Sequence, residues 1–134
     1  RHIDVHQKEV GVFRRQDAFD ALDQLSAGNA RFDAVIADPP PFARSKKDVP
    51  TALKGYRKLA RMAAGLVAPG GFLFIASCSH NVTTEAFAEE VEGGISRAGR
   101  EGRIVLASGA GADHPVHPQL PETAYLKALT LQLD

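Results

Sequence analysis

Two apolar segments, residues 34–37 and 72–76, are continuous rather than alternating, and charged or turn-forming residues bound both of them. Short continuous segments of this kind are typical of strands covered on both faces, as in a parallel sheet. Between them, residues 51–67 place apolar side chains at helical spacing and basic side chains opposite, which predicts an amphipathic helix. Pro69-Gly70-Gly71 is expected to end this helix.

The residues before position 34 predict one further strand and one further helix. Residues 10–16 alternate loosely between apolar and polar side chains, which favours a strand. Residues 20–26 carry apolar side chains at helical spacing, and Gly28-Asn29 would end that helix. Residues 1–6 are too few to assign and are compatible with the tail of a helix.

The C-terminal third predicts a helix and two strands. Thr83 is a candidate N-cap, and apolar residues then recur at helical spacing to position 98, although Gly93-Gly94 weakens this helix by about 1 kcal/mol per glycine relative to alanine. Residues 103–107 predict a strand, and residues 108–122 a loop rich in glycine, proline and histidine. Residues 123–133 alternate apolar and more polar side chains, which predicts a half-exposed final strand.

This order of elements defines the fold class that we expect. Strands and helices alternate through most of the chain, which indicates an α/β protein with a parallel sheet and right-handed crossovers. No helix separates the last two strands, so we expect them to pair as an antiparallel extension at one edge. The sequence shows no internal domain boundary.

Composition narrows the function classes only slightly. The chain has 134 residues, enough for one small domain or part of a larger one, with 44% hydrophobic and 24% charged residues and no net charge. A single cysteine excludes an internal disulfide and cysteine-rich zinc sites. No stretch of 18 apolar residues is present, so we expect no membrane span. The chain begins without methionine or a signal sequence, and we expect a fragment of a cytoplasmic protein.

Charge is unevenly distributed despite this balance. Seven basic residues and one acid lie between Arg44 and Arg61, whereas residues 85–92 contain four acids and no base. A basic patch on a neutral protein can attract phosphate groups. A solvated helix face explains the same pattern equally well.

Candidate catalytic residues follow the two apolar segments. Asp38 begins an Asp-Pro-Pro-Pro sequence after the first, and Cys78 lies between two serines after the second. Ligands bind at the carboxyl ends of strands in open α/β sheets. A thiolate there would be a strong nucleophile, although a lone cysteine is more often a small buried apolar residue. Asp38 with its prolines would form a rigid corner suited to a flat base or an amino group, or it is a turn aspartate.

Other polar residues carry weaker signals. Asp17 could accept a hydrogen bond from an exocyclic amine while Phe19 packs on a flat ring, but an N-cap role for Asp17 is at least as well supported. His80 could act as a base or cap a turn. His114 and His117 lack a third nearby ligand, so we expect no metal site. The sequence contains no Gly-x-Gly-x-x-Gly, Walker or Gly-x-Ser-x-Gly motif.

Taken together, several motifs resemble those of the class I rRNA large-subunit methyltransferases that make 5-methylcytidine. The resemblance extends from the Asp17-Ala18-Phe19 turn to the C-terminus. It is carried by Asp38-Pro39-Pro40-Pro41-Phe42-Ala43-Arg44-Ser45-Lys46, Lys54-Gly55-Tyr56-Arg57, Ser77-Cys78-Ser79-His80, Asp113-His114-Pro115-Val116 and Pro121-Glu122-Thr123-Ala124-Tyr125-Leu126-Lys127.

This resemblance implies a Rossmann-like sheet that binds S-adenosylmethionine (SAM). It implies that Cys78 attacks C6 of a cytosine and that Asp38 contacts the target base. The cofactor would lie against Asp17, Ala18, Phe19, Asp38 and Pro39. The rRNA substrate would contact Pro40, Phe42, Lys46, Lys47, Tyr56, Arg57, Ser79 and His80, with the target base flipped out where it is paired.

The resemblance also implies that residues 1–134 are the C-terminal half of a catalytic domain. The family's glycine-rich cofactor loop and its ribose-binding acid would then lie upstream of Arg1. We therefore expect the chain alone to be inactive. The edge of its first strand would need a cover, which a second copy in a homodimer could provide.

Two other functions remain open on the sequence. The Asp-Pro-Pro corner also suits a SAM-dependent amino-methyltransferase, in which Cys78 would have no catalytic role. A non-catalytic α/β fragment that binds RNA through its basic helix is the second. The methyltransferase hypothesis depends on one geometric condition, namely that the sulfur of Cys78 and the carboxylate of Asp38 open into the same crevice.

Overall fold

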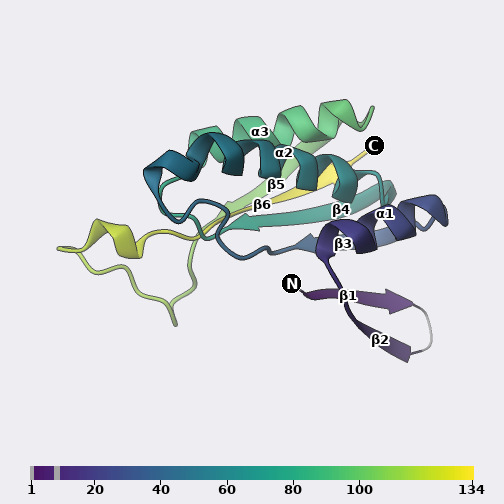
Figure 1. Ribbon diagram of the computed structural model, residues 1–134, viewed down its shortest axis with the longest axis horizontal. Helices are drawn as coiled ribbons and strands as arrows, with labels where there is room; N and C mark the ends of the chain where they lie inside the picture. Colours follow the sequence, from purple (N-terminus) through teal and green to yellow (C-terminus); the bar gives the residue numbers. More distant parts are fainter. Residues whose placement is uncertain (1, 8–9) are drawn as a thin grey trace.

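The computed structural model describes residues 2–7 and 10–134. A four-stranded mixed sheet forms the centre of the molecule, and two long helices, α2 and α3, lie across one of its faces (Figure 1). The elements in chain order are β1 His2–Gln7, β2 Val10–Arg15, α1 Ala18–Ala27, β3 Phe32–Ala37, η1 Lys46–Asp48, α2 Val49–Ala64, β4 Val67–Ser77, α3 Thr84–Arg97, β5 Gly102–Ser108, η2 Pro121–Thr123 and β6 Lys127–Leu133.

The strands of the main sheet follow the order β3-β4-β6-β5. β3 and β4 are parallel, with Ala37 opposite Ile75. β6 is antiparallel to both of its neighbours, which confirms the antiparallel final strand. β5 and β6 pair with each other at one edge of the sheet, as expected for the last two strands, with β5 outermost. The prediction that the final strand is half-exposed is wrong, because Leu129, Leu131 and Leu133 are buried under the helices.

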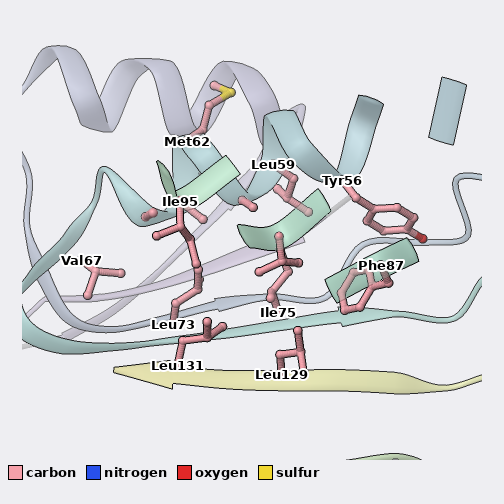
Figure 2. Packing of buried hydrophobic residues seen from close by; sticks show 14 of the residues in the cluster. Tyr56, Leu59, Met62, Val67, Leu73, Ile75, Phe87, Ile95, Leu129 and Leu131 are labelled. Carbon is pink, nitrogen blue, oxygen red and sulfur yellow. The ribbon is translucent and has the colours of Figure 1, made fainter. Parts of the chain in front are cut away.

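The hydrophobic core lies between the sheet and the two long helices. Leu73 and Ile75 of β4 point toward α2 and α3, together with Leu129 and Leu131 of β6 (Figure 2). The other face of the sheet is not covered in the described chain: Ile36 is 68% and Phe72 is 43% exposed. The prediction that the apolar strands are covered on both faces is therefore wrong for this chain, since α2 and α3 lie on the same side.

The predicted helices form with small differences in their ends. Thr83 is confirmed as the N-cap of α3, where its Oγ1 accepts a hydrogen bond from the Ala86 N–H at 3.2 Å. α2 ends at Ala64, three residues earlier than expected, because Leu66 and Val67 already bury their side chains at the start of β4. Pro69-Gly70-Gly71 lies inside β4, where Gly70 has a positive φ of 76°.

The N-terminal part differs most from the prediction. The strand expected at residues 10–16 forms as β2, but it pairs with β1 in a separate antiparallel hairpin instead of joining the main sheet. The described part of residues 1–6 is a strand, not the tail of a helix. Among the described residues, no helix combines the length and apolar character that crossing a membrane requires.

Candidate active site

The ends of β3 and β4 bring Asp38 and Cys78 to the same edge of the sheet. Because these strands are parallel neighbours, the residues that follow them leave the sheet side by side. The Sγ of Cys78 lies 3.7 Å from the carbonyl oxygen of Pro39, which is a weak S–H···O contact. Cys78 is partly exposed and Asp38 is exposed, so both can meet a ligand from solvent.

The electrostatic surroundings of Cys78 favour the protonated thiol. Burial raises the pKa of Cys78 above its ordinary value, and the negative charge of Asp38 raises it further. A main-chain hydrogen bond and the positive charge of Lys127 lower the same pKa by smaller amounts. The pKa of the thiol therefore responds to an anion from the loop after β3 and to a cation from β6.

A buried hydroxyl network supports the two loops that follow the strands. The Oγ of Ser79 accepts hydrogen bonds from the N–H groups of Phe42 and Ala43, at 3.1 and 3.2 Å. The same Oγ shares a hydrogen bond of 2.9 Å with the phenol oxygen of Tyr56, in which either hydroxyl can donate. Ser77 donates a hydrogen bond of 2.8 Å to the same phenol. The proline corner and the cysteine loop are thus joined through Ser79.

This network changes the roles of two residues that the sequence placed on the RNA surface. Tyr56 and Ser79 have no exposed surface, and their hydroxyl groups bond to each other. A side chain with no exposed surface cannot contact RNA in this arrangement. The structure places both residues underneath the reactive edge, where they fix the position of its loops.

Arg57 is also engaged within the protein. Its guanidinium binds both carboxylate oxygens of Glu90, with Nη2 at 2.8 Å from Oε1. This bidentate pair raises the pKa of Arg57, so the side chain stays charged. Because Arg57 lies on α2 and Glu90 on α3, the pair joins the two helices, and only the remaining N–H groups of the guanidinium are left for a contact with RNA.

The predicted cofactor residues Asp17, Ala18 and Phe19 lie at the start of α1. The carboxylate of Asp17 accepts the Phe19 N–H at 2.9 Å and is the N-cap of α1, as its alternative interpretation held. The ring of Phe19 lies 6.5 Å from that of Phe42, in the loop after β3. Lys58 of α2 places its ammonium group 4.6 Å from the centre of the Phe19 ring. The α1 turn therefore contacts the loop that carries the proline corner.

The remaining predicted substrate residues lie at the surface. Pro40, His80 and the lysine pair Lys46 and Lys47 are exposed, while Phe42 is half-buried and stacks at 4.6 Å on Tyr56. The two lysines form a short 3-10 helix that Ser45 and Asp48 cap. Among the described residues, no group of three histidine, cysteine or acidic side chains could hold a metal ion.

Sequence reasoning missed Lys127 as part of this site. Lys127 is buried, and its Nζ donates hydrogen bonds to the carbonyl oxygens of Ser79 and Tyr125, at 2.9 and 3.0 Å. The alternation of the last strand could have indicated this burial. Lys127 alternates in register with Leu129, Leu131 and Leu133, so its side chain lies on the same buried face of β6. A lysine on the buried face of a strand needs polar partners, which indicates a site rather than packing.

Comparison with known proteins finds similarity to methyltransferases. No family model matches the chain. Over 118 residues (88% of the chain) it is 41% identical to a ribosomal RNA large subunit methyltransferase of Deinococcus radiodurans. Over 131 residues (96% of the chain) it is 35% identical to ribosomal RNA large subunit methyltransferase I of Pseudoalteromonas atlantica. The chain spans only about a third of these relatives, 28% and 33% of their lengths.

Solved structures agree on the fold. The crystal structure of the methyltransferase SMU.776, complexed with S-adenosylhomocysteine, superposes on 87% of this chain with a TM-score of 0.71 and 26% identity, and the match covers 30% of that protein. A SAM-dependent methyltransferase from Streptococcus mutans gives a TM-score of 0.70 at 24% identity, over 87% of this chain and 29% of that one. This chain therefore has the Rossmann-like fold of SAM-dependent methyltransferases, and its sequence relatives are ribosomal RNA large subunit methyltransferases.

Proposed function

We propose that this chain belongs to an enzyme that transfers a methyl group from SAM to C5 of a cytidine in large-subunit rRNA, with Cys78 as the nucleophile. The observation that carries the proposal is the 3.7 Å contact between the Cys78 sulfur and the Pro39 carbonyl, which joins thiol and proline corner at one sheet edge. The names of the sequence relatives support rRNA as the substrate. In this proposal, residues 1–134 are the C-terminal half of the catalytic domain.

The chemistry follows from what a thiolate does to a pyrimidine. Cys78 loses its proton, and its sulfur forms a bond to C6 of the cytosine, which moves the electron pair of the C5–C6 double bond onto C5. C5 would then take the methyl group, and the bond between that carbon and the donor sulfur would break, with its electron pair left on the sulfur. Removal of the C5 proton by a base returns the electron pair to the ring, and the bond between sulfur and C6 breaks. Asp38 would hold the base through its exocyclic amine while these bonds change.

The residues at this edge fit the cofactor chemically. SAM, when bound, supplies a methyl group on a positively charged sulfur. Asp38 is exposed beside the Cys78 loop and Asp17 is exposed at the α1 turn, so this side of the chain offers carboxylates to the cofactor's cationic groups and adenine amine. Phe19, half-buried next to Asp17, gives a flat apolar surface.

The decisive experiment removes the sulfur. We expect Cys78→Ala in the complete enzyme to abolish formation of 5-methylcytidine in rRNA, measured by mass spectrometry of digested nucleosides. Binding of SAM, measured by calorimetry, should persist because the methyl donor does not depend on the thiol. Full methylation by Cys78→Ala would exclude the assigned nucleophile. RNA binding that SAM does not affect, with no methylation by the wild type, would favour a non-catalytic RNA-binding fragment.

One observation favours a second candidate, an amino-methyltransferase. Burial and Asp38 both raise the pKa of Cys78, which keeps the thiol protonated near neutral pH. In that enzyme Asp38 and the proline corner would hold an acceptor amine, and Cys78 would take no part. The same nucleoside analysis separates the candidates, because the methyl group would then be found on an exocyclic nitrogen.

A further inference from the structure

Lys127 is the buried charged residue nearest to the proposed nucleophile that the reaction above does not use. Lysine is among the residues least often buried, because removing an ammonium group from water is costly unless partners compensate. Here 8% of Lys127 remains exposed. In the described part of the chain it forms no ion pair with a carboxylate, and its two hydrogen-bond acceptors are the neutral carbonyls of Ser79 and Tyr125.

The sheet register fixes where this ammonium group lies. Lys127 is directly opposite Ser77 in the antiparallel β4–β6 pair. Opposite residues project to the same face, so both side chains lie on the helix-covered side of the sheet. Lys127 then reaches past the end of β4 to the carbonyl of Ser79, and Cys78 lies in sequence between Ser77 and Ser79.

We propose that Lys127 is a positioning residue for Cys78: its ammonium group holds the loop of Ser79 against β6 and supplies the positive charge that stabilises the Cys78 thiolate. This inference deepens the proposed function and rests on Cys78 being the nucleophile. The donor count agrees with it. An ammonium group has three N–H donors, and among the described residues only two have acceptors, so one remains for the anion that forms when Cys78 loses its proton.

The effect of Lys127 on the pKa of Cys78 can be distinguished from that of Asp38, because the two charges have opposite signs. Asp38, from the loop after β3, raises the pKa of Cys78, whereas Lys127, from β6, lowers it. The phenol of Tyr56 on α2 is hydrogen-bonded to the two serines, and His80, in the loop of Cys78, is exposed. Replacing Asp38 and Lys127 should therefore change thiol reactivity in opposite directions.

The test measures the thiol without RNA or SAM, so that its failure is distinct from failure of methyl transfer. Because Cys78 is the only cysteine in residues 1–134, its alkylation by iodoacetamide across pH can be followed in the complete enzyme by the mass of the peptide that contains it, which reports this thiolate alone. We expect Lys127→Met to slow alkylation at pH 7.5 about threefold or more and to move the pH midpoint upward. Asp38→Asn should move it downward, and Lys127→Arg, which keeps the charge, should restore the wild-type profile.

The control is Arg103→Met, which removes one positive charge from exposed strand β5 and should leave the profile unchanged. The inference is overturned if Lys127→Met and Arg103→Met give the same profile as the wild type. It is also overturned if Lys127→Arg behaves like Lys127→Met, since the lysine would then be needed only for its shape. Should Lys127→Met not fold, Lys127→Arg and Asp38→Asn still decide: a profile for Asp38→Asn that does not move downward would exclude electrostatic control of the thiol.

Discussion

A β-carbon placed on Gly94 would lie 2.5 Å from the main-chain oxygen of Arg57, closer than real β-carbons approach such atoms. Gly94 belongs to α3 and Arg57 to α2, so the missing side chain is what lets the two helices meet. Ala60 would lie 2.6 Å from the same position. The helix pair that covers the sheet, and so supports Tyr56 beneath the reactive edge, depends on this close approach.

Gly94→Ala should therefore destabilise the protein, even though alanine favours helices over glycine by about 1 kcal/mol. Pushing main-chain atoms of two helices apart costs more than this gain, and we expect a net loss of about 2 kcal/mol. Urea unfolding followed by circular dichroism measures the difference. Gly93→Ala is the matched control, since its nearest neighbour would be the flexible side chain of Arg57 at 3.6 Å. Equal stability of the two variants would contradict the packing argument.

The neighbouring glycines show where the sequence stops being informative. The sequence predicts that Gly93 and Gly94 weaken the helix. It does not predict which of the two faces α2, because that depends on a contact between segments over 30 residues apart. The strands of the main sheet, the helices and the Asp38–Cys78 edge could be predicted from local periodicity and from the parallel order, whereas the strand β1 could not. The position of β6 between β4 and β5 could not be predicted, because the pairing of strands that are distant in sequence does not show in the local pattern of residues. The hydrogen bond from Lys127 to the Ser79 carbonyl follows from that placement.

Ser79→Ala should loosen the proline corner. The N–H groups of Phe42 and Ala43 would lose their acceptor, and an unpaired buried donor costs about 1–3 kcal/mol. We expect faster amide hydrogen exchange at these two positions, together with lower stability in urea. Ser96→Ala, at an exposed position on α3, provides the comparison and should leave both measurements unchanged. Unaltered exchange at Phe42 and Ala43 would show that other groups hold this loop.

Stability should fall in acid partly through Asp134. Hydrogen bonds from Arg100 and from the Glu101 N–H lower the pKa of Asp134 below its model-compound value of 3.8. A depressed pKa means that the charged form is favoured in the folded state. Its contribution is therefore present above the ordinary pKa and is lost as pH falls through the folded one. Asp134→Asn should be less stable than wild type at pH 7, with the difference shrinking toward pH 2.

Thermal unfolding between pH 7 and pH 2 tests this sign. Arg100 also donates to the carbonyls of Ala64 and Val67, at 3.0 and 2.8 Å, so the same side chain ties the C-terminal strand to the turn between α2 and β4. Asp23→Asn, at an exposed position on α1, should follow the wild-type pH dependence. A constant difference between Asp134→Asn and wild type at every pH would mean that the carboxylate acts through its shape and not through its charge.

The exposed lysines of η1 should contact RNA phosphates in the complete enzyme. Each ammonium group that meets a phosphate releases about 0.7 counterions from a single strand, which sets the slope of log affinity against log salt. Changing Lys46 and Lys47 together to glutamine should weaken RNA binding and reduce that slope by about 1.4. The matched pair Arg97→Gln and Arg103→Gln removes two exposed charges on α3 and β5, and should leave the slope unchanged. If both pairs reduce the slope equally, RNA responds to the total charge of the protein, and the loop after the proline corner has no special place in binding it.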